Sequence, residues 1–488
     1  METLIKFDVQ NERNLTMLVD FYELTMANGY FNKGVENRIA YFDMYFRRVP
    51  DGGGYCIMAG VEQLIQYLSN LKFTSSDIDY LRSKNIFSEE FLEYLEDFKF
   101  CCDVWAIPEG NPVFPNEPLV IVRGPVVQAQ FVETMILLTI NHQTLIATKA
   151  NRICRAAEGK TVMEFGSRRA QGYDGAIYGA RASIIGGCDS TACTIADKYF
   201  NVPAVGTMAH SWVQLFDTEF EAFKAWAETY PDNCSLLIDT YNVLKSGLPN
   251  AIKVFDEVLK PLGKRPTGIR IDSGDITYLT KKCRKILDEA GYSDCKIIIS
   301  NSLDEHIIRD VINQGACIDS FGVGERLITA KSEPVFGGVY KLVAVEKEDV
   351  IIPKIKISEN NEKITNPGFK KIYRLFDRDT NIAIADVLAL SDEVIDDSKE
   401  YEIFDPIHTW KRKKVTNFYV KDLLVKIFDK GTLVYTSPSV LEIKEFAKVE
   451  TNKLWPEILR FENPHTYYVD LSTKLWSLKQ KLLLNQSK

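Results

Sequence analysis

The sequence predicts an α/β protein whose central part is an irregular (β/α) barrel, with an α+β N-terminal domain and a smaller C-terminal α+β portion. The basis is a set of six apolar, β-branched runs after residue 160, each ending in polar or glycine residues. Helical stretches separate most of them, which is typical of a parallel α/β architecture. Six such units favour a barrel over an open sheet. The runs are TVMEF (161–165), AVGTM (204–208), LLIDTYNV (236–243), GIRIDSGD (268–275), KIIISNS (296–302) and DSFGVGERL (319–327).

The segments on either side of the barrel have different patterns. Residues 15–30 predict an amphipathic helix that ends at Gly29, and a long apolar helix or helix pair is expected at 126–157. Beyond Val339, alternating runs predict antiparallel β-structure, followed by a terminal amphipathic helix. We therefore divide the chain into an N-terminal domain (1–155), a phosphate-binding barrel (156–345) and a C-terminal segment (346–488).

The composition argues against several classes of protein. The net charge of -8 disfavours a general nucleic-acid binder. The ten cysteines are scattered without the spacing of a zinc site, so reduced thiols are expected. The N-terminal sequence METLIKFDVQNERN lacks the basic flank and apolar core of a signal peptide, and no apolar run approaches membrane-spanning length. We expect a cytoplasmic protein that binds small molecules, not nucleic acid or a membrane.

Two adjacent arginines mark the first candidate site. Ser167, Arg168 and Arg169 follow Gly166, where the first barrel strand ends. Two guanidiniums at the end of a strand suit an anionic ligand, because each offers a fork of donors that matches phosphate or carboxylate. The alternative is that both arginines form ordinary surface ion pairs.

The same stretch continues through a glycine-rich turn to a histidine. GGCDST (186–191) predicts a turn before a helix that Asp189 or Ser190 caps. His210 follows the AVGTM run, and it is either a ligand-facing side chain or a satisfied core histidine. Three polar strand ends in succession favour a ligand site, since ligands of parallel α/β folds bind at the carboxyl ends of strands.

Carboxylates follow the next two strands. In GIRIDSGD, Arg270, Asp272 and Asp275 surround a Ser-Gly turn, and the two carboxylates can hold ribose hydroxyls or a hydrated magnesium ion. The alternative, which can hold at the same time, is a helix N-cap. Asp239 and Asn242 end the neighbouring strand, and a carboxylate near an imidazole would orient it and stabilise its charged form.

The last two strands end in small residues that suit a phosphate. Ser300 and Asn301 stand in SNSLDE, while Gly322 and Gly324 stand in FGVGERL. Such residues free backbone N–H groups at helix starts, and barrels commonly bind phosphate after their last strands. Together these patterns predict an enzyme that handles a phosphorylated sugar with a charged leaving group.

Seven ordered motifs resemble those of the nicotinate phosphoribosyltransferases, a type II phosphoribosyltransferase family. They are DFYELTMANGYF, YFRRVP, EFGSRRAQG, GTMAHSW, IRIDSGD, SNSLDE and FGVGERLIT, and the ending PHTYYVDLSTKLWSLKQKLL is similar as well. The resemblance implies condensation of nicotinate with phosphoribosyl pyrophosphate to nicotinate mononucleotide and pyrophosphate. It also implies Mg2+ and ATP as a co-substrate, whose hydrolysis is coupled through a phosphorylated histidine.

The resemblance also implies roles for particular residues. It makes His210 the phosphohistidine and, by analogy with the related nicotinamide enzyme, places the pyridine ring between Phe165 and Tyr22 of the partner subunit, hence a homodimer with shared active sites. The catalytic set it implies is His210, Arg270, Asp272 and Asp239, with Asp272 and Asp275 as candidate metal ligands. The substrate-binding set is Tyr22, Phe165, Ser167, Arg168, Asp189, Asn242, Ser273, Gly274, Asp275, Ser300, Asn301, Gly322, Val323 and Gly324.

Two acidic residues fit this resemblance poorly. Asp189 matches a position that faces the carboxamide in the nicotinamide enzyme, and its carboxylate would repel nicotinate unless it is turned away or paired, for example with Arg169 or Arg181. Glu325 is an unusual neighbour for an anion, which Arg326 would offset. Three alternatives therefore stay open: a nicotinamide enzyme, a quinolinate enzyme, and a silent dimer that senses phosphoribosyl ligands. A quinolinate site would need a denser basic pocket and no ATP-linked histidine.

Overall fold

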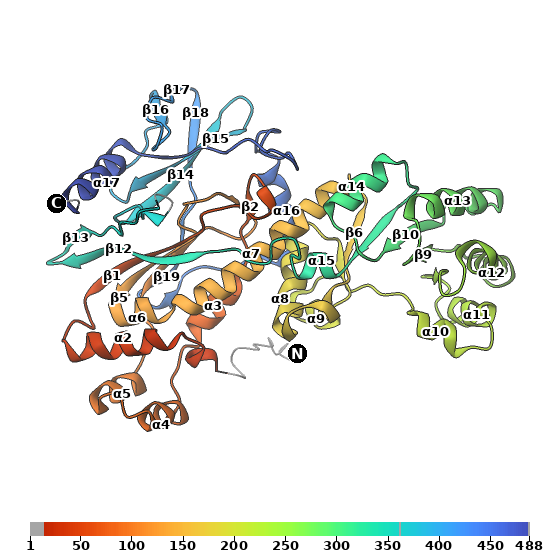
Figure 1. Cartoon of the computed structure of the whole chain (residues 1–488), viewed down its shortest axis with the longest axis horizontal. Coiled ribbons are helices and arrows are strands. Elements are labelled where there is room, and N and C mark those ends of the chain that lie inside the picture. The colour runs from red at the N-terminus through yellow and green to blue at the C-terminus, as the bar shows by residue number, and fades with distance from the viewer. Residues whose placement is uncertain (1–13, 361–362, 487–488) are drawn as a thin grey trace. The chain divides into compact units, whose positions relative to one another are not determined.

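The computed structural model describes residues 14–360 and 363–486, which fold into two compact units. The barrel unit is Ile146–Pro334, and the sheet unit combines Met1–Leu145 with Val335–Lys488. Helix α7 (Glu133–Ala156) carries the chain from the sheet unit into the barrel unit (Figure 1). Of the N-terminal segment that argues against a signal peptide, only Asn14 lies within the described residues.

Six parallel strands form the sheet of the barrel unit, in the order β7-β6-β11-β10-β9-β8. If the sheet is followed as a ring, the strands come in their order along the chain, from β8 to β11 and then β6 and β7. The ring is open between β7 and β8. Beyond β7, Ala204 makes an isolated parallel bridge to Thr191, and no ladder of the described residues joins that segment to β8. The strands are β6 (Thr161–Glu164), β7 (Ser190–Thr191), β8 (Ser235–Leu237), β9 (Gly268–Ile271), β10 (Lys296–Ser300) and β11 (Ser320–Val323). The predicted irregular barrel is confirmed.

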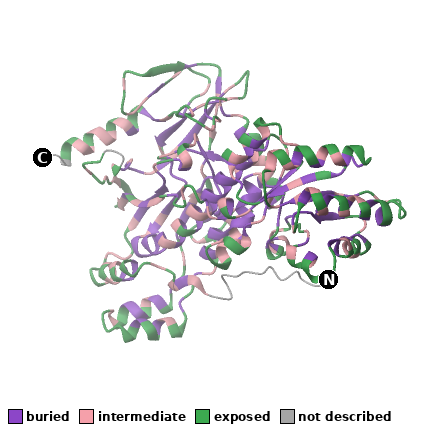
Figure 2. Ribbon diagram, turned by 45° about the vertical axis from the view of Figure 1, so that its right-hand side comes forward, coloured by how far each residue is buried: buried purple, intermediate pink, exposed green. Residues whose placement is uncertain are grey.

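Helices connect these strands (Figure 1). In α13, Thr280, Cys283 and Leu287 are buried at helical spacing while neighbouring positions are exposed, so one face packs inward (Figure 2). The helical elements are η3 (Ser167–Arg169), α8 (Gly172–Ile185), α9 (Thr194–Phe200), α10 (His210–Leu215), α11 (Glu219–Thr229), η4 (Val243–Gly247), α12 (Leu248–Val254), η5 (Phe255–Leu259), α13 (Ile276–Glu289), α14 (Glu305–Asn313) and α15 (Glu325–Ile328).

Two local predictions in the barrel unit are wrong. The AVGTM run does not form a regular strand, because only Ala204 makes a ladder contact. Asp189 and Ser190 cap no helix: Ser190–Thr191 is strand β7, which pairs with Met163 and Glu164 of β6. Helix α9 begins only at Thr194. A two-residue strand is too short to leave a periodic pattern, so the sequence could not reveal it.

The sheet unit is built on a seven-stranded antiparallel sheet in the order β13-β12-β1-β5-β3-β19-β20. Residues 335–345, assigned above to the barrel segment, belong to this unit. The strands of the sheet are β1 (Ile39–Tyr45), β3 (Asp103–Ala106), β5 (Val120–Pro125), β12 (Val339–Lys347), β13 (Val350–Pro353), β19 (Val425–Asp429) and β20 (Thr432–Leu433).

Smaller sheets complete this unit, in line with the β-rich C-terminal portion predicted. A four-stranded sheet has the order β18-β14-β15-β21, and its apolar cluster includes Leu375, Val387 and Phe418. Its strands are β14 (Lys370–Asp377), β15 (Ala383–Leu390), β18 (Phe418–Asp422) and β21 (Val469–Leu471). There are also two two-stranded sheets among the described residues. One pairs β2 (Cys56–Ile57) with β4 (Pro112–Val113), and the other pairs β16 (Tyr401–Phe404) with β17 (Arg412–Val415).

The helices of the sheet unit include one that differs from its prediction. The segment expected as a single helix is a turn, η1 (Leu15–Met17), followed by α2 (Phe21–Asn32), so Gly29 lies inside the helix and does not end it. Every helix among the described residues is too short or too polar to cross a lipid bilayer. The others are η2 (Pro50–Gly52), α3 (Val61–Ser69), α4 (Ser75–Ser83), α5 (Glu89–Glu96), α6 (Val126–Phe131), α16 (Val440–Thr451) and α17 (Thr473–Gln486).

Candidate active site

The carboxyl ends of five barrel strands, β6, β7, β9, β10 and β11, and the loop 205–209 line a cleft of about 330 Å3 within the barrel unit. This is the edge at which parallel α/β sheets bind ligands. The predicted site residues that line it are Phe165, Arg168, Arg270, Asp272, Ser300, Asn301, Gly322 and Gly324.

The charge of the cleft is predominantly positive. Five cationic side chains line it against two carboxylates, so a strongly anionic ligand would be attracted. The cations are Arg168, Arg169, Arg270, Arg326 and Lys331, and the carboxylates are Asp272 and Glu325.

Arg270 connects three parts of the cleft floor. From strand β9, its Nε donates to Ser300 Oγ at 2.9 Å, its Nη1 to Thr207 Oγ1 at 3.2 Å and its Nη2 to Asp272 Oδ1 at 3.3 Å. Ser300 also donates to Asp272. The guanidinium therefore fixes the ends of β9 and β10 and the loop that replaces the AVGTM strand.

Asp239 supports the turn that follows β9. Its Oδ2 accepts the Asp272 N–H at 3.0 Å and the Ser273 hydroxyl at 2.6 Å. Its Oδ1 is buried, and no described residue donates a hydrogen bond to it. Gly274 continues the turn at φ +87°, a conformation that favours glycine. Asp275 accepts the Tyr278 N–H at 2.7 Å, so it caps α13.

His210 lies at the edge of the cleft, and the interpretation as a core histidine is wrong. It begins α10, and its side chain is 42% exposed. Its Nδ1 lies 3.1 Å from Thr240 Oγ1 and its Nε2 lies 3.9 Å from Asp272 Oδ2. The imidazole is thus held from one side and presents its other nitrogen toward a carboxylate of the cleft.

Phe165 packs directly over the glycine of β11. A Cβ on Gly322 would lie 2.6 Å from Cδ2 of the Phe165 ring, so only glycine fits beneath it. The Arg270 Cζ lies 5.7 Å from the ring centroid. The Phe165 N–H donates to the carbonyl of Val323, which is itself buried in β11. Val323 therefore supports the cleft and does not line it.

The two arginines after Phe165 differ in their partners. Arg169 forms an exposed ion pair with Glu325 at 3.9 Å, as the surface interpretation predicted. Arg168 lines the cleft, and within the described residues it forms no ion pair. The Ser167 hydroxyl oxygen is buried and has no hydrogen-bond partner in the part of the chain that the structure describes. Arg168 therefore remains available to an anionic group of a ligand.

The loop after β10 has an unusual backbone. Asn301 and Ser302 both have positive φ, +86° and +53°, which is uncommon for residues other than glycine and costs free energy. Both residues line the cleft. Asp304 then caps α14, accepting the His306 and Ile307 N–H groups at 3.1 and 2.9 Å.

Lys331 contributes most to lowering the pKa of Glu325, and the Arg326 charge helps to lower it, as expected. Arg326 pairs with Asp304, whereas Glu325 pairs with Lys331 at 2.6 Å and with Arg169. The hydrogen bond from Lys331 lowers the pKa of Glu325. Glu325 is thus neutralised from two sides.

Asp189 does not line the cleft, which corrects its predicted role. Its carboxylate accepts the Val162 N–H at 3.0 Å, near the start of β6 and away from the carboxyl end of that strand. Ala192, just beyond β7, lines the cleft instead, and its N–H donates to the Glu164 carbonyl at 2.8 Å. The sequence spacing alone did not distinguish these two positions.

Two other predicted residues also lie outside the cleft lining. Asn242 accepts the Lys245 N–H at 2.8 Å and caps η4. Tyr22 belongs to the sheet unit, where it lies in the first turn of α2 and is 44% exposed.

Within the described residues, no three His, Cys, Asp or Glu side chains form a metal-binding group. The Asp272 carboxylate lines the cleft and nevertheless fits Mg2+, which usually keeps several waters and binds one or two protein carboxylates together with substrate phosphates. Asp239 accepts the Asp272 N–H, and among the described residues its other carboxylate oxygen has no hydrogen-bond partner. Asp275 is already engaged in capping α13.

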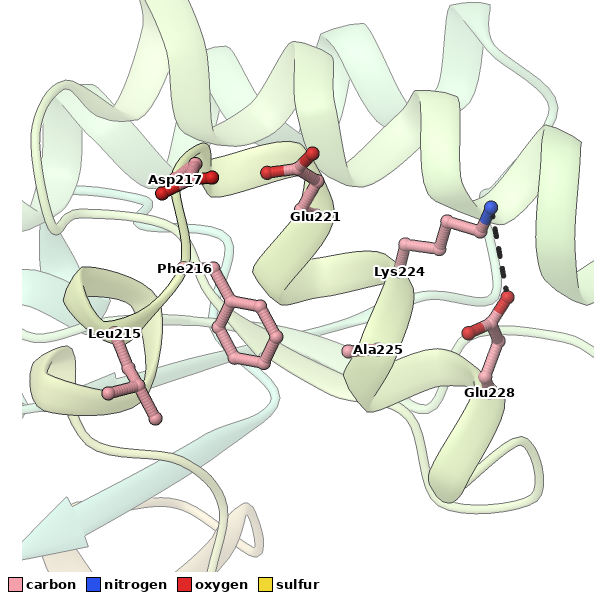
Figure 3. Close-up of a pocket in the computed structure, with 7 residues that line it drawn as sticks. All are labelled: Leu215, Phe216, Asp217, Glu221, Lys224, Ala225 and Glu228. Carbon is pink, nitrogen blue, oxygen red and sulfur yellow. Dashed lines mark ion pairs between the residues drawn. The ribbon is translucent and has the colours of Figure 1, made fainter.

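A second pocket lies on α10 and α11 (Figure 3). Phe216 and Leu215 form one side, and Lys224 pairs with Glu228 at 3.9 Å on the other. Its remaining charged residues, Asp217 and Glu221, are acidic. This pocket lacks the convergence of strand ends and cations found in the cleft, which is therefore the better candidate.

Comparison with known proteins identifies the family. Residues 17–141 match the profile of the nicotinate phosphoribosyltransferase (NAPRTase) N-terminal domain, residues 161–380 that of the NAPRTase family, and residues 369–479 that of the NAPRTase C-terminal domain. The nicotinate phosphoribosyltransferase of Bacillus subtilis is 46% identical over 470 residues, covering 96% of this chain and 95% of that protein. The chain belongs to the nicotinate phosphoribosyltransferase family. It is therefore an enzyme.

Other members of the nicotinate phosphoribosyltransferase family are similar along the whole chain. The human nicotinate phosphoribosyltransferase is 31% identical over 530 residues, which cover 96% of this chain and 97% of that protein. The crystal structure of human nicotinic acid phosphoribosyltransferase superposes with a TM-score of 0.83 at 28% identity, covering 96% of this chain and 100% of that one. A nicotinate-nucleotide pyrophosphorylase from Pyrococcus furiosus shares the fold, with a TM-score of 0.69 at 22% identity.

Some residues of the site escaped sequence reasoning. Lys331 lies in the cleft, although it follows the FGVG motif by several residues and stands in the turn after α15. Thr207 and Ala192 have small side chains that carry no charge signal. Their place in the site depends on which strand ends meet, and that is set by the sheet order.

Proposed function

We propose that this protein transfers the phosphoribosyl group of phosphoribosyl pyrophosphate to nicotinate, giving nicotinate mononucleotide and pyrophosphate in NAD biosynthesis. Its membership of the nicotinate phosphoribosyltransferase family supports the reaction. The observation that carries the substrate assignment is a cleft rich in arginine and lysine from which the Asp189 carboxylate is turned away. Nicotinate and pyrophosphate are both anions, and such a cleft attracts both.

The proposed chemistry relies on electrostatics and positioning. Departure of pyrophosphate leaves positive charge on the ribose, while negative charge grows on the leaving group. We assign Arg270, Arg326 and Lys331 to the pyrophosphate side because they line the same cleft. The pyridine nitrogen is already nucleophilic and needs only alignment with the ribose carbon, which fixed binding groups provide.

We assign the pyridine ring to the end of β6. Phe165 offers an aromatic face that packs on Gly322, and the Arg168 guanidinium has no ion-pair partner among the described residues. A stacked ring and a charge-assisted hydrogen bond to the nicotinate carboxylate would fix its orientation. The methyl side chain of Ala192 cannot accept a hydrogen bond from a carboxamide, so the argument that a carboxylate at this position favours nicotinamide does not apply.

We propose that Mg2+ binds together with phosphoribosyl pyrophosphate. Asp272 and Asp239 are the residues that would hold it, with substrate oxygens and water completing the shell. The ion would neutralise charge on the leaving pyrophosphate. Ser300, Asn301, Gly322 and Gly324 are assigned to the phosphate and ribose of the sugar.

ATP is proposed as a co-substrate through His210. Its imidazole is accessible and lies beside Asp272. A ring nitrogen would take the γ-phosphoryl group as the bond to the bridging oxygen breaks, and ADP would leave with the electron pair. Water later removes the phosphoryl group as phosphate, and this hydrolysis would drive a reversible transfer toward product.

We propose a homodimer with shared active sites, on the basis of the exposed Tyr22. Tyr22 is exposed at the start of α2 beside Leu18 and Phe21, which are 43% and 47% exposed. Exposed apolar side chains of this kind suit an interface between subunits. In mixed dimers of Tyr22→Ala with His210→Ala, sites shared between subunits would restore part of the activity that each homodimer lacks; no restoration would contradict shared sites.

We also propose a cytoplasmic location. All ten cysteines lie within the described residues and are free thiols. Free thiols are typical of proteins in a reducing compartment such as the cytoplasm. Fractionation of the source cells with immunodetection would test the assignment.

The deciding experiment offers nicotinate, nicotinamide and quinolinate in parallel, each with phosphoribosyl pyrophosphate and Mg2+, and each with and without ATP. Nicotinate mononucleotide formed preferentially, and faster with ATP, is the expected result. A preference for nicotinamide would overturn the substrate assignment. Binding of the sugar phosphate without any turnover would favour the sensor alternative.

A further inference from the structure

A buried carboxylate lies directly beneath the turn that carries Phe165. Glu164 is the last residue of β6 and is 0% exposed. Its Oε1 accepts the N–H of Gly166, and its Oε2 accepts the hydroxyl of Thr191 at 2.6 Å. Burial raises the pKa of Glu164, while the hydrogen bonds from Thr191 and Gly166 favour its ionised form. No step of the transfer reaction described above uses this group.

Thr191 extends the same network to β7. Its Oγ1 accepts the Cys193 N–H at 3.0 Å while its hydroxyl donates to Glu164. The Ala192 N–H donates to the Glu164 carbonyl at 2.8 Å. Glu164 therefore joins the ends of two neighbouring strands through both its side chain and its backbone.

The turn above Glu164 is confined from the other side as well. A Cβ on Gly166 would lie 2.5 Å from Cβ of Ile328 and 2.8 Å from the Gly324 carbonyl oxygen. Gly166 therefore packs closely against Ile328 and Gly324, with no space for a side chain. On its other side, its N–H donates to Glu164.

We propose that Glu164 is a positioning residue for pyridine binding, because its hydrogen bonds with Gly166, Thr191 and Ala192 hold the Phe165–Arg168 turn against the end of β7. This inference rests on the proposed function, because it assigns the pyridine to this end of the cleft. Glu164 touches no substrate. It acts through the turn after β6, and the Thr191 hydroxyl is its partner.

A carboxylate suits this place because two donors must be accepted at once. An ionised carboxylate is an acceptor on both oxygens. The amide of a glutamine offers one acceptor and one donor, so it keeps the Gly166 bond only by donating to the Thr191 hydroxyl. That reverses the bond between positions 164 and 191 and leaves the Thr191 hydroxyl proton without its acceptor. A buried group that loses its partner is strongly disfavoured, and the turn is expected to shift.

The test compares Glu164→Gln, Thr191→Val and the double variant in steady-state kinetics. Each single variant is expected to raise the nicotinate KM roughly tenfold, and the phosphoribosyl pyrophosphate KM less than about twofold. Because both changes remove the same bond, the double variant should resemble the worse single variant. Thr191→Ser, which keeps the hydroxyl, should restore the nicotinate KM.

Thr280→Val is the matched control in the barrel unit. Thr280 is also fully buried, and its hydroxyl donates to the Ile276 carbonyl at 2.8 Å and accepts the Cys317 N–H at 3.2 Å. It should lower thermal stability without changing the nicotinate KM. Equal increases in both KM values, or none, for Glu164→Gln would overturn the positioning role.

A crystal structure of Glu164→Gln separates this inference from the proposed function. If the wild-type protein makes no nicotinate mononucleotide, the proposed function fails, yet a displaced Phe165 in the variant would still support the positioning role. An unmoved Phe165–Arg168 turn would refute that role whatever the activity.

Discussion

The His210 Nε2 lies 3.9 Å from Oδ2 of Asp272, although the two residues are 62 positions apart in the chain. Asp272 is held in place by Arg270 and by Asp239, which accepts its N–H. A phosphoryl group on His210 would therefore stand next to the carboxylate assigned to magnesium. This relationship links ATP use to the pyrophosphate side of the cleft.

Replacing His210 by alanine should abolish ATP stimulation and leave a slower, ATP-independent transfer. The reason is that the imidazole is the group proposed to accept the phosphoryl, while the cations that bind pyrophosphate are untouched. ATP consumed per nicotinate mononucleotide is the measurement. His465→Ala, an exposed histidine of the sheet unit, is the control. Unchanged stimulation in His210→Ala would remove its assigned role.

Arg270→Lys should lower kcat/KM for phosphoribosyl pyrophosphate by about 10- to 100-fold, because lysine lacks the planar fork that reaches Ser300, Thr207 and Asp272. Initial rates at varied phosphoribosyl pyrophosphate check this. Arg284→Lys on α13, outside the cleft lining, should stay within about twofold. A fully active Arg270→Lys would show that charge alone suffices.

Gly322→Ala should raise the nicotinate KM about tenfold, since the new methyl group would lie 2.6 Å from the Phe165 ring and must displace it. The measurement is the nicotinate KM, together with the thermal midpoint. Gly29→Ala is the control, because nothing lies within 4 Å of its Cβ and the residue is inside α2. A normal KM in Gly322→Ala would mean that Phe165 does not bind the pyridine.

Ala192→Asp should shift specificity from nicotinate toward nicotinamide. A carboxylate at this position would repel nicotinate and accept a hydrogen bond from the amide. The ratio of kcat/KM for the two pyridines measures the shift, expected to be about tenfold or more. Asp189→Ala should leave that ratio unchanged, because its carboxylate bonds to Val162 outside the cleft. A larger effect at Asp189 would reverse the correction made above.

The stability of the sheet unit should fall as pH rises from about 5 to 8, in part through Glu23. Burial raises the pKa of Glu23 from 4.5 to about 8. Between these values the unfolded chain is ionised while the folded carboxyl keeps its proton, so the folded state loses up to about 1.4 kcal/mol per pH unit. Above pH 8 both states are ionised and the loss levels off.

Thermal midpoints of Glu23→Gln between pH 5 and 8.5 test this expectation. The variant should show a flatter pH dependence than the wild type, since glutamine does not titrate. Glu96→Gln at the exposed end of α5 is the control and should follow the wild type. Identical curves for Glu23→Gln and the wild type would rule out Glu23 as the cause.

The barrel could be predicted because its strands are apolar runs interrupted by polar ends, a pattern that burial imposes on sequence. The same logic found the site residues with strong chemical signals, such as Arg270, Asp272 and His210. It failed at Asp189 and Ala192, which are three residues apart. Which of the two residues lines the cleft depends on β7, a two-residue strand that forms by pairing with β6.

By itself, the sequence determined the fold class, the family and the set of charged groups that could serve the reaction. Periodicity and local motifs are properties of neighbouring residues, and the chain order records them. Only the tertiary structure decided which groups meet: His210 beside Asp272, Lys331 in the cleft, Asp189 turned away and Glu164 beneath the Phe165 turn. Those relationships follow from the order and register of parallel strands, which long-range hydrogen bonds set and no local pattern encodes.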